Sequence, residues 1–188
     1  MDDFSNTRRN FLLGALVTPM ALGVAACARA ADNATPPSAE VLIEKFSARG
    51  ISTGKAKVPR VVKTDEDWRK QLSDISFAVA RKAGTERPFT GKYNDNHADG
   101  VYRCICCHTT LFDSKNKFDS GTGWPSFWKP LSAINVEESA GGSHMLGTEV
   151  HCARCSGHLG HVFDDGPEPT GLRYCINSVS INFAPRSA

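Results

Sequence analysis

Two pairs of cysteines constrain this 188-residue chain more than any other feature. The pairs are Cys104 with Cys107 and Cys152 with Cys155, and each pair encloses two residues. That spacing lets a tight turn aim both sulfurs at one ion, and two such turns complete a tetrahedral thiolate shell. We therefore expect one structural Zn²⁺ with no open coordination position. Cys106 competes as a ligand, but the spacing favours Cys104 with Cys107. The alternative is disulfide bonds, because six cysteines allow about 15 connectivities.

Composition and charge limit the class of protein. The chain has 22 basic and 20 acidic residues, a formal net charge of +2, and 40% hydrophobic residues, as in an ordinary globular protein of about one domain. No apolar run is long enough for a membrane-spanning helix. A charge this close to neutral argues against a duplex-DNA binder, which needs a basic face, so we expect no nucleic-acid partner.

Residues 1–30 are typical of an export signal. Arg8 and Arg9 directly precede an apolar stretch over residues 12–26, an arrangement that resembles a twin-arginine signal. We expect cleavage after Ala30 and a periplasmic location. Two alternatives remain. The segment that ends in Cys27 resembles a lipobox, and lipidation there would tether the protein to a membrane; the whole segment could also be an amphipathic or frayed helix.

The remainder is predicted to be a flexible lead-in over residues 31–60 and one domain over 61–188. Thr64 can cap a helix whose first turn is acidic, and Gly84 can close it. The apolar residues of this helix recur at helical spacing and are predicted to pack into the core: Trp68, Leu72, Ile75 and Val79. Short β-branched and aromatic runs after residue 89 favour strands separated by turns.

Cys175 is left without a CxxC partner and lies in a strand-like segment. A lone cysteine in a strand is more often buried packing than a nucleophile. Other segments make catalysis more plausible, because His158 and His161 lie three residues apart and Trp124 lies between a glycine and a proline. A thiol, imidazoles and an aromatic wall would then share one site. The alternatives are half-buried structural histidines, a histidine ligand to the metal, and a tryptophan that only packs in the core.

Several motifs in the same order resemble the B-type methionine sulfoxide reductases, the peptide-methionine (R)-S-oxide reductases. The resemblance runs from about Asp65 to Phe183. Besides the CxxC pairs, the motifs that carry it are Arg87-Pro88-Phe89, Ser120-Gly121-Thr122-Gly123-Trp124-Pro125-Ser126-Phe127, His158-Leu159-Gly160-His161-Val162-Phe163, Asp165-Gly166-Pro167 and Arg173-Tyr174-Cys175-Ile176-Asn177-Ser178.

The resemblance implies a mainly β fold: two antiparallel sheets in a barrel-like core, short N-terminal helices, and a structural zinc opposite the active site. It also implies repair of oxidised methionine, in which Cys175 attacks the sulfoxide sulfur and becomes a sulfenic acid. It implies that His158, His161 and Asn177 line the oxygen's side. Trp124 and Phe183 would bind the substrate, with Trp124 over its methyl end.

The chain departs from the family where many members place a resolving cysteine. Thr122 occupies that position, and a hydroxyl cannot form the disulfide that would discharge a sulfenic acid. We expect an external reductant of the thioredoxin or glutaredoxin type to act directly; Cys106 is the alternative resolving thiol. The competing interpretation of the whole chain is a non-catalytic exported zinc-ribbon binding module.

Overall fold

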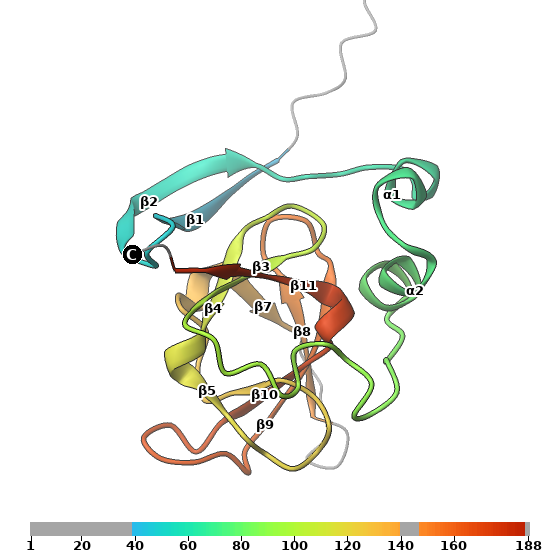
Figure 1. Ribbon diagram of the computed structural model, residues 1–188. Coiled ribbons are helices and arrows are strands. Elements are labelled where there is room, and N and C mark those ends of the chain that lie inside the picture. The colour runs from blue at the N-terminus through green and yellow to red at the C-terminus, as the bar shows by residue number, and fades with distance from the viewer. Residues whose placement is uncertain (1–38, 140–146, 187–188) are drawn as a thin grey trace, which may run out of the picture. The chain divides into compact units, whose positions relative to one another are not determined.

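The structure is a computed structural model that describes residues 39–139 and 147–186 (Figure 1). Its strands are β1 (Glu40–Phe46), β2 (Ser52–Pro59), β3 (Gly100–Cys104), β4 (Thr110–Asp113), β5 (Lys117–Phe118), β6 (Ser126–Phe127), β7 (Val136–Glu138), β8 (Thr148–Cys152), β9 (His158–Phe163), β10 (Arg173–Ile176) and β11 (Ile181–Pro185). The helices are α1 (Asp65–Gln71) and α2 (Asp74–Lys82), with short 3-10 turns η1 (Ser114–Asn116), η2 (Ala133–Asn135) and η3 (Ser178–Ser180). The predicted export signal lies outside the described residues. Within the described ranges, no helix combines the length and apolar character needed to cross a membrane.

The strands form three antiparallel sheets. One has six strands in the order β5-β6-β10-β9-β8-β7, one has three in the order β11-β3-β4, and β1 with β2 forms a separate hairpin. A barrel requires its outermost strands to pair with each other, and the outer strands of these sheets do not. The prediction of a mainly β, antiparallel fold is therefore confirmed. The barrel-like closure is not found among the described residues, and the sheets number three rather than two.

An aromatic core joins the two larger sheets. Phe112 of β4 stacks on Phe127 of β6 with ring centroids 4.5 Å apart, and Tyr102 of β3 meets Phe127 edge-on at 5.1 Å. All three side chains are fully buried. Burial of rings this large dominates the packing energy of a small core. These rings cover the face of the six-stranded sheet that is turned toward the three-stranded sheet.

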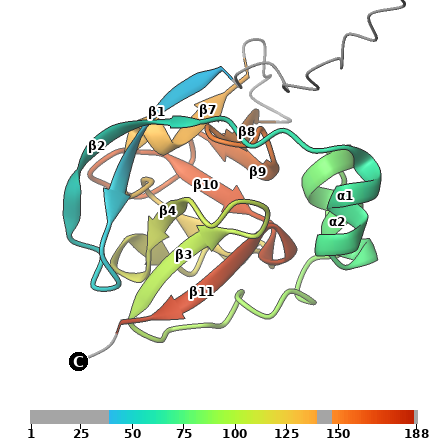
Figure 2. The same ribbon diagram turned by 90° about the horizontal axis from the view of Figure 1, so that it is seen from above.

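The segment predicted as one helix from Thr64 to Gly84 is two helices, which lie together at one flank of the strands (Figures 1 and 2). Thr64 caps α1 as expected, accepting a hydrogen bond from the Asp67 amide at 3.2 Å. The chain then breaks because Ser73 caps a second helix in the same way. The break leaves Ile75 52% exposed, whereas Trp68 is buried as predicted.

Residues 40–59, expected to belong to a flexible lead-in, instead form the β1–β2 hairpin. Of its large apolar side chains only Ile43 is buried, so the hairpin adds little to the hydrophobic core. Its anchor is polar and distant: the side chain of buried Asn135 accepts from the Glu44 amide at 2.8 Å and donates to the Glu44 carbonyl at 2.9 Å.

Candidate active site and metal centre

The four cysteines of the CxxC pairs come together as the spacing predicts. Their sulfurs all lie within 4.8 Å of one another, with Cys104 3.6 Å from Cys155 and Cys107 3.5 Å from Cys152. Sulfurs at ~2.3 Å from a tetrahedral zinc would be ~3.8 Å apart, whereas a disulfide needs ~2.05 Å. The cluster therefore fits a metal ion better than disulfides, and the four thiols can hold one.

Cys175 lies on β10, in a row of residues paired across the six-stranded sheet. It is paired with His161 of β9 and Ser126 of β6, and His161 is paired in turn with Glu149 of β8. Directly paired residues present their side chains on the same face of a sheet. The thiol, the imidazole and a carboxylate therefore share one face.

A β-bulge brings His158 to the same region. Residues three apart in a regular strand point to opposite faces, so His158 and His161 should be separated. The register between β8 and β9 shifts, however: Val150 faces Gly160 while the next residue, His151, faces His158. The extra residue in β9 turns His158 back, and its ring centroid lies 5.4 Å from that of His161.

Gly160 is required at this bulge. Its φ is +156°, and a Cβ there would overlap the carbonyl oxygen of Cys175. Only glycine lets β9 approach the strand of Cys175 so closely. This glycine therefore sets the distance between the imidazoles and the thiol.

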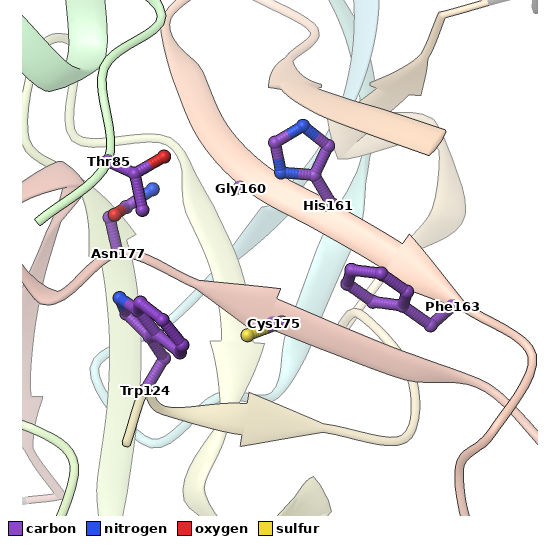
Figure 3. Close-up of a pocket in the computed structure, with 7 residues that line it drawn as sticks. All are labelled: Thr85, Trp124, Gly160, His161, Phe163, Cys175 and Asn177. Atoms are coloured by element: carbon purple, nitrogen blue, oxygen red, sulfur yellow. The ribbon is translucent and has the colours of Figure 1, made fainter. Parts of the chain in front are cut away.

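A cavity of about 140 Å³ opens beside Cys175. It is lined by Thr85, Trp124, Gly160, His161, Phe163, Cys175 and Asn177. Figure 3 shows the sulfur of Cys175 between the rings of Trp124 and Phe163, with the His161 imidazole on the neighbouring strand. A cavity of similar volume in another protein accommodates benzene, so this one suits a small, mainly apolar group with a polar end.

Buried Glu86 organises one wall of this cavity, and nothing in the sequence indicated that role. Its carbonyl accepts from the Trp124 indole nitrogen at 3.2 Å, and its amide donates to the Asn177 side-chain oxygen at 3.0 Å. Its carboxylate accepts from the amides of Ser178 and Val179 at 2.6 and 3.0 Å. The orientations of Trp124 and Asn177 are thereby fixed before any ligand binds.

The thiol of Cys175 faces hydroxyl groups in place of a second thiol. The Thr122 hydroxyl lies 3.9 Å from the Cys175 sulfur and 2.8 Å from the Ser120 hydroxyl, which is 2.8 Å from that of Ser126. Burial raises the pKa of Cys175, and the Thr122 hydroxyl and the charge of Arg173 only partly oppose this rise. The resting group is therefore a protonated thiol at neutral pH.

Burial also lowers the pKa of both site histidines, His158 and His161. Glu149 acts in the opposite direction on both, but burial has the larger effect. The neutral imidazoles therefore stand beside a protonated thiol, a pairing in which one proton can move between the two groups without any change in net charge.

Arg173 and Asp165 form an ion pair near the thiol. The guanidinium donates to both carboxylate oxygens, at 2.7 and 2.8 Å, and lies 4.2 Å over the ring of Phe163. Asp165 fixes the position of the Arg173 guanidinium, and the guanidinium packs on the ring of Phe163 at the wall of the cavity. Both residues belong to motifs of the family resemblance, but no role for them was predicted.

The structure assembles most of the predicted site, but not all of it. Cys175, His161, Asn177 and Trp124 line one cavity, and His158 lies against His161. Phe183 does not line that cavity, because it packs against Tyr102 with ring centroids 5.1 Å apart. Phe163 occupies the aromatic position instead, which its place two residues after His161 in the same strand could have indicated.

Cys106 lies with the four-cysteine cluster and not with Cys175. Its side chain is 3% exposed, and its sulfur and that of Cys155 are both next to Gly157. It is not among the residues that line the cavity of Cys175. This placement disfavours Cys106 as a resolving thiol.

Comparison with known proteins identifies the family. The SelR domain matches residues 72–185. The peptide methionine sulfoxide reductases MsrB of Pseudomonas entomophila and Hahella chejuensis are 58% and 55% identical over 128 and 125 residues, covering 68% and 66% of this chain and 98% and 90% of theirs. That of Thioalkalivibrio sulfidiphilus is 58% identical over 121 residues, covering 64% of this chain and 88% of its own. The chain therefore belongs to the B-type peptide methionine sulfoxide reductases, the peptide-methionine (R)-S-oxide reductases.

Proposed function

We propose that this protein reduces methionine-(R)-sulfoxide, free or in oxidised proteins, with Cys175 as the nucleophile. The observation that carries the proposal is a lone thiol on the wall of a small cavity that also contains an imidazole and two aromatic rings. The side chain of methionine sulfoxide has about as many heavy atoms as benzene, which a cavity of this volume can hold. Family membership favours this enzyme over a non-catalytic zinc-ribbon module.

The neutral resting state supports a mechanism without an external proton. The thiol proton of Cys175 moves to His161 as the sulfur attacks the sulfoxide sulfur, and the imidazolium returns that proton to the oxygen. The attack forms a bond between the two sulfurs, and the S–O bond of the substrate breaks as the protonated oxygen leaves as hydroxide. That hydroxide then bonds to the Cys175 sulfur while the bond between the two sulfurs breaks, so that methionine is released and Cys175 is left as a sulfenic acid. One thiol and one sulfoxide give one sulfenic acid and one thioether, so atoms and electrons balance.

Binding is divided between apolar and polar walls. The rings of Trp124 and Phe163 flank the thiol and are suited to the methyl end of the substrate. His161 and Asn177 also line the cavity, and we assign to them the oxygen of the substrate. A hydrogen bond that strengthens as the oxygen gains charge stabilises the transition state more than the bound substrate.

The hydroxyl neighbours of Cys175 support recycling by an external dithiol of the thioredoxin or glutaredoxin type. Thr122 cannot form a disulfide, and Cys106 lies beside the metal cluster. Two thiols of the reductant would convert the sulfenic acid to the thiol, with release of water and formation of one disulfide in the reductant. The sulfenic acid should therefore persist until that partner arrives.

We propose that the metal at the four-cysteine cluster is a structural Zn²⁺. Its support is the sulfur spacing and the absence of an open position once four thiolates bind. The sequence of residues 1–30 supports export by a twin-arginine route to the periplasm, with lipidation of Cys27 as the alternative. A route that carries folded proteins would let zinc bind before the thiols meet an oxidising compartment.

A chiral turnover assay tests the proposed activity. The protein, with thioredoxin and its reductase, is given a peptide containing methionine-(R)-sulfoxide or its S epimer, and methionine is quantified. We expect turnover of the R epimer only, and none by Cys175→Ser. Equal turnover of both epimers, or activity retained in Cys175→Ser, would contradict the proposal.

A further inference from the structure

We propose that Glu149 is a positioning residue for the imidazoles of the active site. It is the carboxylate at the end of the paired row that contains His161 and Cys175, and it contacts two further histidines. This inference rests on the proposed function, since positioning matters only if the imidazoles move protons. Glu149 is not among the site residues predicted from the sequence.

The geometry fixes the proton positions. One oxygen of Glu149 lies 2.6 Å from Nδ1 of His158 and 3.0 Å from Nε2 of His151. An ionised carboxylate only accepts hydrogen bonds, so each of these nitrogens must carry a hydrogen. A neutral His158 is thereby held as the Nδ1–H tautomer, and its Nε2 is an acceptor.

The other nitrogen of His158 has no hydrogen-bond partner in the part of the chain that the structure describes. Nε2 is completely buried, and the side chain of His158 is only 3% exposed. A buried polar nitrogen without a partner is costly, so it is retained when it serves a reaction or a ligand. The ring lies edge-on to that of His161, which lines the cavity, with ring centroids 5.4 Å apart.

The charge of Glu149 acts on the same pair. Burial lowers the pKa of His158 and His161, and Glu149 raises the pKa of each in opposition to burial. The positive charges of His151 and His161, when protonated, add to the lowering at His158. Without the carboxylate, the imidazoles would hold a proton less readily at the moment when the thiol releases one.

Two substitutions of Glu149 separate its geometry from its charge. Glu149→Met keeps the approximate size but removes the acceptor, and Glu149→Gln keeps an acceptor oxygen but removes the charge. The matched control is Glu66→Gln, because Glu66 lies on α1, pairs with Lys70 at 2.9 Å and is not among the residues that line the cavity. Zinc content and thermal midpoint establish that each variant is folded.

We expect Glu149→Met to lower kcat by about 10–100-fold, the loss found when a carboxylate that orients a metal-ligating imidazole is removed, with KM within about threefold. Glu149→Gln should lose less, and Glu66→Gln should match the wild type. In ¹⁵N-histidine spectra at pH 8, His158 of the wild type should carry its proton on Nδ1, and Glu149→Met should lose that preference. A merely structural carboxylate would not change the tautomer together with kcat.

The proposal is overturned if the wild-type His158 carries its proton on Nε2, or if Glu149→Gln and Glu149→Met both retain kcat within about twofold. The spectrum needs no turnover, so it remains decisive if Glu149→Met does not fold. It also separates the two proposals: an inactive wild type with the expected tautomer would contradict the proposed function and leave the position of the imidazole intact.

Discussion

The four-cysteine cluster and the Cys175 cavity both contain cysteine sulfur, but the groups that surround the sulfur differ. In the cluster, four thiols face one another at separations such as 3.5 and 3.6 Å. In the cavity, one thiol faces hydroxyls, imidazole and aromatic rings, and the neighbouring Thr122 oxygen is 3.9 Å away. The two sites differ in the number of thiols within reach: four in the cluster, which can hold a metal ion, and one at the cavity.

The largest expected effect is at the reactive sulfur. Cys175→Ser should lower kcat by more than about 10³-fold, because a hydroxyl is a far weaker nucleophile and cannot accept the oxygen as a sulfenic acid. Metal content and thermal midpoint should stay at wild-type values, since Cys175 belongs to the other site. Loss of metal in Cys175→Ser would show that the two sites are not separate.

The second effect tests the imidazole of the cavity. His161→Ala should lower kcat by about 10²-fold, within the range for positioned proton transfer. Thiol acidity alone cannot give this effect: lowering a thiol pKa by about two units gains ~25-fold in thiolate at pH 7 but loses ~8-fold in nucleophilicity. Steady-state rates of His161→Ala and His158→Ala decide; a loss below about fivefold in both would contradict the assigned role.

The third effect should appear in stability and not in chemistry. A structural zinc contributes about 10–16 kcal/mol in small peptides, so losing one of four ligands in Cys152→Ser should cost about 3–4 kcal/mol. That cost corresponds to a fall in thermal midpoint of about 6–16 °C. Scanning calorimetry with zinc analysis measures both quantities. An unchanged midpoint with zinc lost would mean that the metal does not stabilise the fold.

A fourth prediction concerns a variant in which Cys175 can form an internal disulfide. Thr122→Cys places a second sulfur beside Cys175, where the threonine oxygen now lies at 3.9 Å. One equivalent of substrate should then produce an internal disulfide, seen as a loss of two hydrogens in the intact mass. Thr122→Ser is the matched control and should show no such loss. Absence of the disulfide in Thr122→Cys would mean that the loop cannot close on Cys175.

The smallest effect concerns pH. The proposed mechanism requires a neutral His161 and a protonated Cys175 thiol. The value of kcat/KM should therefore fall at low pH, where His161 becomes protonated, and at high pH, where the Cys175 thiol loses its proton. The Thr122 hydroxyl lowers the pKa of Cys175. Thr122→Val should therefore raise that pKa and move the alkaline limb to higher pH, with less than about a threefold change at pH 7. A shift to lower pH would contradict this assignment.

The sequence predicted the four-cysteine cluster because the cluster depends on local spacing, whereas the role of Cys175 as a nucleophile rests on the family resemblance and stays a prediction. Two residues between thiols define a turn at each cysteine pair, and Thr64 caps a helix through its own neighbours. The hairpin over residues 40–59 could not be predicted, because its anchor is Asn135, far along the chain. Ser73 is a possible helix cap in the sequence, but the apolar spacing on both sides of it favours one continuous helix.

The finer geometry of the site depends on strand register, which spacing does not reveal. His158 and His161 share a region only because a bulge interrupts β9. Glu149 joins them through pairing with a strand that follows later in the chain. Phe163 lines the cavity because β9 presents it beside Cys175, whereas Phe183 lies on another sheet.

The central claim is that Cys175 is oxidised by the substrate and, without an internal partner, stays as a sulfenic acid. The direct measurement is the whole-protein mass after one equivalent of methionine-(R)-sulfoxide in the presence of dimedone, with Cys175→Ser as the control. We predict one dimedone adduct, mapped to Cys175, and one zinc retained in the native spectrum. A loss of two hydrogens without an adduct would contradict the claim and make Cys106 the resolving thiol. No oxidation at all would contradict the assignment of Cys175 as the nucleophile.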